Sequence, residues 1–162
     1  MISKIFHDYE LCEYDLTSKP LFKNIRLSDN IYKSLKFKYS IAKSLNFKKY
    51  LEFRFTNNYS PVAFLDATPS SKYLSFNLSN EVSNDSLSSS ISKYLKKYKF
   101  ENLSNQNYYK YLKNQNYDLV HIECGKYDSK FYELLFESLK CTDWILVSNY
   151  YEDTEFFNEL KH

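Results

Sequence analysis

The chain has 162 residues, enough for one domain with a hydrophobic core. Its 22 Lys and Arg nearly balance its 20 Asp and Glu, so the net charge does not indicate a nucleic-acid partner. No apolar run is long enough for a signal peptide at the N-terminus or for a membrane span elsewhere. The 3 Cys form no CxxC pair, which predicts free thiols in a reducing compartment, and we therefore expect a soluble cytoplasmic protein.

The amino-acid usage is biased. The chain contains 17 Tyr and 13 Phe but a single glycine, Gly125. Abundant Lys, Asn, Tyr, Phe, Ile and Ser with scarce Gly, Ala, Pro and Arg are what an AT-rich genome would give. We therefore interpret the aromatic residues mainly as core residues, and only weakly as platforms for base stacking.

Positive and negative charges lie in different parts of the chain. Residues 18–50 contain nine Lys or Arg and one acid, a net charge of +8. Residues 118–162 contain ten acids and four Lys, a net charge of −6. Two interpretations stay open: two solvated faces that partly neutralise each other, or a basic patch for an acidic partner.

The first half of the chain predicts an N-terminal arm and a helix. Residues 1–27 interleave acids with aromatic residues before Pro20 breaks the run, and we expect an irregular arm. Ser28 or Asp29 can N-cap a helix over 29–46. Its apolar residues fall near one face and three lysines lie elsewhere on its surface: inward Ile31, Leu35, Ile41, Ala42 and Leu45, outward Lys33, Lys36 and Lys43.

From residue 50 onward strands alternate with helices. Strand patterns occupy 50–55, 72–77, 98–101, 117–123 and 144–147, and helical spacing occupies 60–66, 87–99, 106–113, 128–139 and 152–160. In the helix over 128–139 we expect four inward residues: Phe131, Leu134, Leu135 and Leu139. The alternation predicts an α/β fold over residues 28–162, a three-layer sandwich around a mostly parallel, Rossmann-like sheet of about five strands.

Four segments in this order carry a family resemblance: 50–60, 74–78, 117–125 and 144–151. The first contains Tyr50-Leu51-Glu52 followed by Asn57, Tyr59 and Ser60. Together the segments resemble the first, second, fourth and fifth strands of class I S-adenosylmethionine-dependent methyltransferases, in particular small O-methyltransferase-like families. The resemblance implies that S-adenosylmethionine would lie over the carboxyl edge of the sheet.

The resemblance also implies which residues would meet this cofactor: Glu52, Thr56, Asn58, Asn77 and Ser104. Glu52 matches the acid near the methionine end. Arg54, Thr56 and Asn58 hold the three glycine positions of the family's cofactor loop. Asn77 stands where an acid binds the ribose hydroxyls, and an amide lacks the stronger charge-assisted bond.

Two residues are candidates for catalysis. Glu123 ends a buried strand, where α/β sheets place their sites, and is the best candidate for a base or a metal ligand. His121 lies two residues earlier and should face the same side of the sheet. Its alternative role is that of a buried, hydrogen-bonded histidine. Glu123 with Ser148 and Asn149 supplies too few oxygen ligands for a magnesium site, so we expect no metal.

The substitutions at the cofactor-loop glycine positions and at Asn77 favour a methyltransferase-like protein with a degenerate cofactor site. Such a protein would act by binding a partner or as a subunit. One alternative is an active methyltransferase on a small-molecule or sugar hydroxyl, with Glu123 as the base. Another is polyanion binding through the lysine-rich helix. We also expect the edge of the fifth strand to be covered by the N-terminal arm or by a second subunit.

Overall fold

The computed structural model describes residues 2–55, 59–78, 86–104, 107–113, 115–124 and 127–149. The chain divides into two compact units. The first comprises Met1–Lys49, Asn57–Tyr73 and Glu81–Glu101, and the second comprises Tyr50–Thr56, Leu74–Asn80 and Asn102–His162. Neither unit is a continuous stretch of sequence, because strands in the middle of the chain contribute to both.

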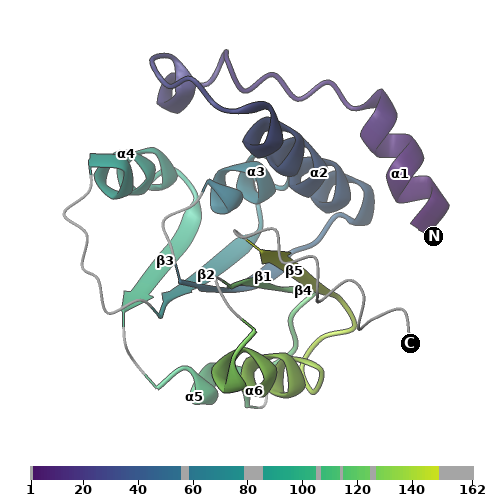
Figure 1. Cartoon of the computed structure of the whole chain (residues 1–162), viewed down its shortest axis with the longest axis vertical. Coiled ribbons are helices and arrows are strands. Elements are labelled where there is room, and N and C mark those ends of the chain that lie inside the picture. Colours follow the sequence, from purple (N-terminus) through teal and green to yellow (C-terminus); the bar gives the residue numbers. More distant parts are fainter. Residues whose placement is uncertain are drawn as a thin grey trace. The chain divides into compact units, whose positions relative to one another are not determined.

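The helices and strands alternate in the predicted order (Figure 1). The helices are α1 (Ile2–Leu11), η1 (Pro20–Phe22), α2 (Asp29–Leu45), α3 (Ser60–Ala67), α4 (Ser86–Leu95), α5 (Tyr109–Leu112) and α6 (Ser129–Ser138). The strands are β1 (Lys49–Arg54), β2 (Lys72–Asn77), β3 (Lys99–Ser104), β4 (Leu119–Cys124) and β5 (Ile145–Asn149). The predicted helix over 152–160 lies outside the described residues.

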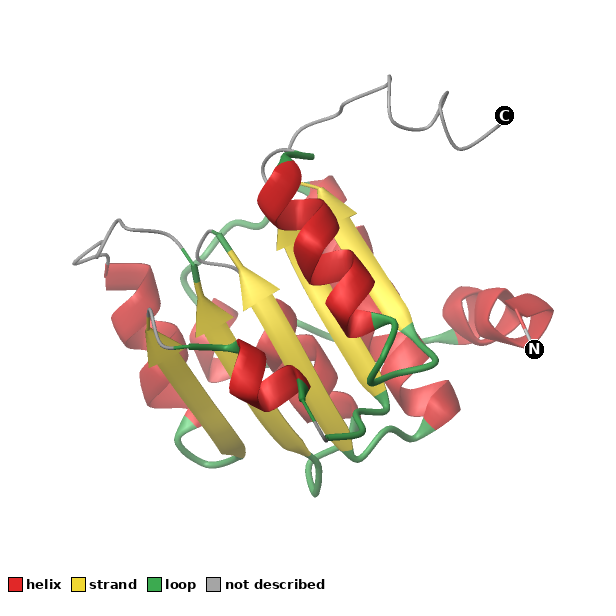
Figure 2. Cartoon of the chain, turned by 90° about the horizontal axis from the view of Figure 1, so that it is seen from below, coloured by secondary structure: helices red, strands yellow, loops and turns green. Residues whose placement is uncertain are grey.

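The strands form one five-stranded sheet in the order β3-β2-β1-β4-β5 (Figure 2). β1 pairs with β4 in parallel, and so does β4 with β5. The amides of Lys72 and Leu78 donate to the carbonyls of Lys48 and Arg54, and this constant offset indicates that β2 runs parallel to β1. The α/β class and the parallel Rossmann-like sheet predicted from the sequence are confirmed.

The core of the second unit lies between its strands and the helices α5 and α6 (Figure 1). Alternate strand residues point into it, among them Leu51, Phe53, Leu74, Phe76, Val120 and Ile122. From α6, Phe131 and Leu134 are buried as predicted, whereas Leu139 is 61% exposed. Leu139 lies just beyond the end of α6, so the helical spacing no longer directs its side chain inward.

In the first unit, one predicted feature differs from the structure. Residues 1–27 are not wholly irregular, since they contain α1 and η1. The aromatic rings of Phe6 and Tyr9 contact Phe37 of α2, at centroid distances of 6.4 and 6.0 Å. This tertiary contact stabilises α1, which was not predicted because acids interleave with the apolar residues of its sequence. The predicted boundary between arm and domain at residue 27 stays a prediction.

Helix capping follows the sequence closely. The hydroxyl of Ser28 accepts a hydrogen bond from the amide of Ile31 at 3.4 Å and caps α2. The carboxylate of Asp128 accepts from the amide of Phe131 at 3.0 Å and caps α6. No helix among the described residues has the length and apolar character needed to cross a membrane.

Candidate functional site

The predicted site residues of the second unit gather on β1, β2 and β4. In the strand order, β1 and β4 are neighbours although they are far apart in sequence, and α/β sheets bind ligands at the carboxyl ends of such strands. Glu52 lies on β1, Asn77 ends β2, and His121 and Glu123 lie on β4. Ser104 is the last residue of β3, while Thr56 and Asn58 lie outside the described residues.

Glu52 and His121 form a buried pair. The two residues lie directly opposite each other in the β1–β4 register. His121 Nδ1 lies 3.0 Å from Glu52 Oε1, and both side chains are almost completely inaccessible to solvent. The second carboxylate oxygen, Oε2, accepts a hydrogen bond from Ser75 Oγ at 2.6 Å. Both oxygens of Glu52 therefore have a partner, as buried charged groups require.

The surroundings of Glu52 keep it ionised. Burial alone would raise the pKa of Glu52, but the hydrogen bond and charge of His121, the charge of Arg54 and the hydrogen bond from Ser75 outweigh it. Together they lower the pKa of this carboxyl to about 2. An ionised carboxylate can only accept hydrogen bonds, so the proton between the two residues belongs to His121 Nδ1.

His121 has a second partner on β5. Its Nε2 lies 2.5 Å from Ser148 Oγ. With Nδ1 carrying the proton toward Glu52, Nε2 accepts from the Ser148 hydroxyl when the ring is neutral and donates to it when the ring is protonated. Ser148, His121, Glu52 and Ser75 thus form one continuous chain of hydrogen bonds across β5, β4, β1 and β2. We call these four residues the relay.

Glu123 lies beside the relay. It is 4% exposed, and the β4–β5 register places it opposite Ser148. It lies on the same face of β4 as His121, which the two-residue spacing predicts. The next residue, Cys124, is also buried, and burial together with the charges of Glu123 and Asp128 raises the pKa of its thiol to about 11. Cys124 is therefore a packing residue.

The side chain of Arg54 reaches from the end of β1 to β3. Its Nη2 donates a hydrogen bond to Asn102 Oδ1 on β3 at 3.0 Å. β2 lies between β1 and β3, so the guanidinium reaches across the end of β2. Arg54 is only 4% exposed, and its Nε is one of the few buried polar atoms of the described side chains that have no hydrogen-bond partner.

The described residues bring together no group of three or more His, Cys, Asp or Glu side chains that could hold a metal ion. The relay contains one carboxylate and one imidazole, and both already have hydrogen-bond partners. The described part of the site thus offers hydrogen-bonding groups and a polarised hydroxyl.

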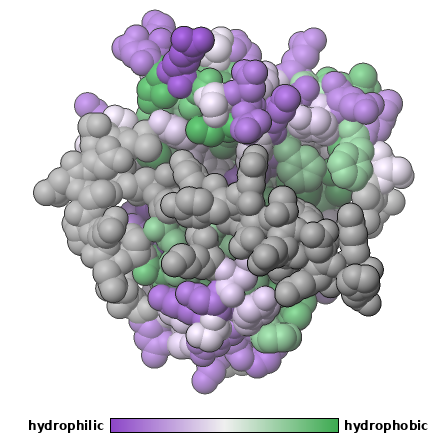
Figure 3. All heavy atoms as spheres, viewed as in Figure 1, coloured by the Kyte–Doolittle hydropathy of each residue, from purple (hydrophilic) through white to green (hydrophobic). Residues whose placement is uncertain are grey.

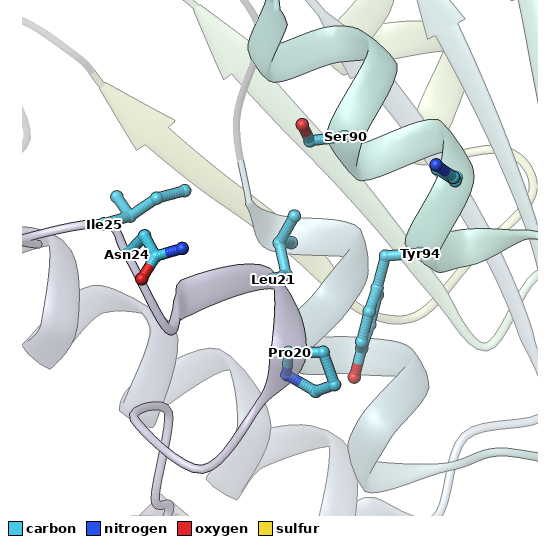
Figure 4. A pocket seen from close by; sticks show the side chains of 7 residues that line it. Pro20, Leu21, Asn24, Ile25, Ser90 and Tyr94 are labelled. Atoms are coloured by element: carbon cyan, nitrogen blue, oxygen red, sulfur yellow. The ribbon is translucent and has the colours of Figure 1, made fainter.

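A separate cavity of about 440 Å³ lies in the first unit, between η1 and α4 (Figure 4). Pro20, Leu21 and Ile25 give it apolar walls, and Ser90 and Tyr94 line it from α4. On the face of the molecule shown in Figure 3, apolar side chains lie among hydrophilic ones. None of the predicted site residues lines this cavity.

Asp66 of α3 organises the first unit beside this cavity. Its carboxylate accepts hydrogen bonds from the hydroxyls of Tyr14 at 3.1 Å, Tyr94 at 2.9 Å and Tyr98, and Lys19 Nζ lies 3.3 Å away. Burial, together with the charge of Asp66 and the hydrogen bonds to it, raises the pKa of Tyr94 to about 12. Asp66 thus connects α3 to α4 and to the segment that precedes η1.

No protein-family model and no curated protein matches this sequence. Solved structures do match. The O-methyltransferase TomG from Streptomyces achromogenes, solved in complex with S-adenosylmethionine, is similar with a TM-score of 0.58 and 14% identity. That match covers 90% of this chain and 70% of TomG. A methyltransferase from Geobacter sulfurreducens has a TM-score of 0.58 at 12% identity, covering 99% of this chain and 87% of that one.

The chain has the class I methyltransferase fold. A third structure with this fold, a putative caffeoyl-CoA O-methyltransferase from Staphylococcus aureus, matches with a TM-score of 0.53 at 14% identity. The match covers 88% of this chain but only 66% of the S. aureus protein. At such low identities the methyltransferase likeness concerns the fold alone.

The sequence did not predict the relay. It singled out Glu52 and His121 for different roles, one at the cofactor and one in catalysis, and gave Ser75 no role. A signal was present: polar residues in the middle of neighbouring buried strands, on the same face, must find each other as partners. Arg54 was recognised as a departure from the family pattern, but its partner Asn102 was not.

Proposed function

We propose that this chain is a diverged protein with the methyltransferase fold that acts by binding a partner and does not transfer methyl groups. The observation that carries this proposal is the buried side chain of Arg54, hydrogen-bonded to Asn102. The family resemblance places bare backbone and the cofactor at this position. A long side chain there takes the place of the ligand.

The position of Arg54 argues against a bound cofactor on steric grounds. The amide of Leu78 donates to the carbonyl of Arg54, so the end of β2 lies beside the arginine. Asn77, where the resemblance places the ribose, is the last residue of that strand. S-adenosylmethionine would have to displace the guanidinium and break its bond to Asn102. This arrangement supports the proposal that the site does not accept this cofactor.

Glu52 supports the same proposal. The resemblance assigns its carboxylate to the methionine end of the cofactor, yet both oxygens accept hydrogen bonds from His121 and Ser75. Its side chain is completely buried. Because the carboxylate is buried and each of its oxygens already accepts a hydrogen bond, we expect it to be a poor contact for a ligand.

Three variants test the proposal by calorimetric titration with S-adenosylmethionine. Arg54→Gly removes both the volume and the charge of the side chain, and we expect it to bind the cofactor more tightly than the wild type. Arg54→Met keeps most of the volume, and we expect no gain. Arg26→Gly removes the chain's other arginine, which is exposed, and serves as the control. Tight binding by the wild type would contradict the proposal.

Glu123 favours a second candidate, an active methyltransferase on a small-molecule or sugar hydroxyl. A buried carboxylate near the carboxyl end of β4 is suited to accept a proton from a substrate hydroxyl. In this case Arg54 would swing aside when the cofactor binds. Methyl transfer by the wild type that is lost in Glu123→Gln, with the fold intact, would favour this candidate over the first.

A further inference from the structure

The relay has the connectivity of a catalytic serine triad. Ser148 Oγ meets His121 Nε2 at 2.5 Å, and His121 Nδ1 meets Glu52 Oε1 at 3.0 Å. In such triads the histidine takes the proton of the serine hydroxyl, and the acid holds the histidine in the correct tautomer. Triads are recognised by this geometry on unrelated folds and not by sequence order. We propose that Ser148 is the nucleophile of an acyl-transfer site that hydrolyses small carboxylic esters.

This inference goes beyond the proposed function and does not depend on S-adenosylmethionine. It uses residues that the family resemblance assigns to other tasks or to none. Of the residues that the resemblance places at the cofactor, only Glu52 takes part in it, and Arg54 and Asn77 do not. Both can therefore be tested on the same protein without one result deciding the other.

The reaction balances with water as the only co-reactant. Ser148 Oγ attacks the ester carbonyl carbon and gives its proton to His121 Nε2. The tetrahedral intermediate then expels the alcohol, which takes that proton from His121. Water attacks the acyl-serine and gives a proton to His121, and Ser148 leaves with it as the free carboxylic acid is released. Glu52 stays ionised throughout and acts as a positioning residue.

Access distinguishes Ser148 from the rest of the relay. Glu52, Ser75 and His121 are almost completely buried, whereas Ser148 is only partly buried. It lies on β5, the last strand in the sheet order. A small acyl group can therefore reach the serine hydroxyl while the histidine and the acid stay shielded from water, where their interaction is strongest.

The main chain of β5 offers a donor for the developing oxyanion. The amide of Val120 donates to the carbonyl of Trp144, and the thiol of Cys124 lies 3.9 Å from the carbonyl oxygen of Ser148. Even-numbered residues of β5 therefore direct their main-chain groups toward β4, and odd-numbered residues direct theirs away. This alternation directs the N–H of Asn149 away from β4, and β5 is the last strand in the sheet order. In many hydrolases the residue after the nucleophile supplies such a donor.

The first experiment labels the full-length protein with a fluorophosphonate probe, which reacts only with activated serines. We expect one adduct per chain, located on Ser148 by peptide mass spectrometry and absent from Ser148→Ala. Ser129→Ala, which removes an exposed serine on α6, should label like the wild type. Ser148→Ala removes one oxygen from a partly buried site and should leave the fold intact, which circular dichroism checks. No adduct on Ser148 would overturn the proposal.

The second experiment measures hydrolysis of p-nitrophenyl acetate. We expect Ser148→Ala to lose about 10²-fold or more of the enzymatic rate, the range attributed to positioned acid–base catalysis. Glu52→Gln should lower the rate and move the midpoint of its pH profile to lower pH, because the carboxylate that stabilises the imidazolium is gone. A purely structural relay predicts equal rates in all variants, and that result would also overturn the proposal.

Discussion

Arg54 on β1 and Asn102 on β3 are joined by a hydrogen bond of 3.0 Å that passes over the end of β2. The bond spans the part of the sheet where the methyltransferase resemblance places the ribose of the cofactor. An arginine at a glycine position is therefore more than a change in loop conformation. It is a buried side chain held by a hydrogen bond, and we propose that it excludes the cofactor.

Strengthening this bond should stabilise the second unit. In Asn102→Asp a carboxylate would replace the amide, and a charge-assisted hydrogen bond to arginine is roughly twice as strong as a neutral one. We expect a gain of about 0.5–1 kcal/mol in the free energy of unfolding at pH 7, measured by urea denaturation. The gain should vanish as the pH falls and the new carboxylate is protonated.

Asn102→Ala is the matched substitution, because it removes the hydrogen bond that Asn102→Asp should strengthen. Arg54 would lose its side-chain partner, and we expect a decrease of about 1 kcal/mol in the free energy of unfolding. If both substitutions at residue 102 left the stability unchanged, the bond would not hold Arg54 in place, and the case for a closed site would weaken.

The ionised state of Glu52 makes stability depend on pH. Its pKa falls from an ordinary value of 4.5 to about 2 in the folded protein. Because the pKa is lowered, the ionised carboxylate contributes to the free energy of unfolding. This contribution is fully present above pH 4.5 and is lost as the pH falls through about 2. Between pH 5 and pH 2.5 we expect the free energy of unfolding of the wild type to fall by on the order of 2 kcal/mol because of this carboxylate. Glu52→Gln should not show this decrease.

The measurement is urea unfolding of wild type and Glu52→Gln at a series of pH values. The two curves should converge on the acid side, since protonation leaves the wild type with a neutral side chain as well. Parallel curves would show that Glu52 is not the ionised partner of His121.

Asp66 should be the residue of the first unit whose loss costs most. Asp66→Ala would leave the hydroxyls of Tyr14, Tyr94 and Tyr98 and the ammonium of Lys19 without their shared acceptor. We expect a decrease of about 3 kcal/mol in the free energy of unfolding. Asp143→Ala, at an exposed position, should change it by less than about 0.5 kcal/mol. Equal effects of the two substitutions would contradict this role.

The lysine-rich helix α2 should bind polyanions only weakly. Lys36 Nζ lies 4.9 Å from the ring centroid of Tyr9, and Lys43 Nζ lies 5.7 Å from that of Tyr39. These cation–π contacts hold two of the three lysines against the protein's own surface. We expect elution from heparin below about 0.3 M salt, with little change when Lys33, Lys36 and Lys43 become Gln. Tight binding that falls steeply with salt in the wild type alone would favour the polyanion alternative.

The sequence predicted the sheet well because each strand carries its own local pattern. The strand over 72–77 was predicted with its observed bounds, and buried apolar residues such as Val120 and Ile122 marked β4. The N-cap candidates Ser28 and Asp29 marked the start of α2, since a side-chain acceptor at the N-cap is a local signal. Helix α1 was missed because its stability comes from contacts with Phe37, which lies far away in sequence.

The site was less predictable because its interactions are long-range. Glu52 and His121 are 69 positions apart, and His121 and Ser148 are 27 apart. The residue types and their positions on strands suggested Glu52 and His121 as candidate site residues. Only the strand order and register decide which of these side chains meet. The reach of Arg54 to Asn102 depends on side-chain conformation, for which the sequence holds no local signal.

The central claim is that the chain keeps the methyltransferase fold without a usable cofactor site. The most direct measurement is calorimetric titration of the wild-type protein with S-adenosylmethionine, with S-adenosylhomocysteine alongside. The account predicts no heat of binding for either compound up to millimolar concentration. Micromolar binding of either compound would mean that Arg54 leaves the pocket and that the chain is a candidate methyltransferase after all.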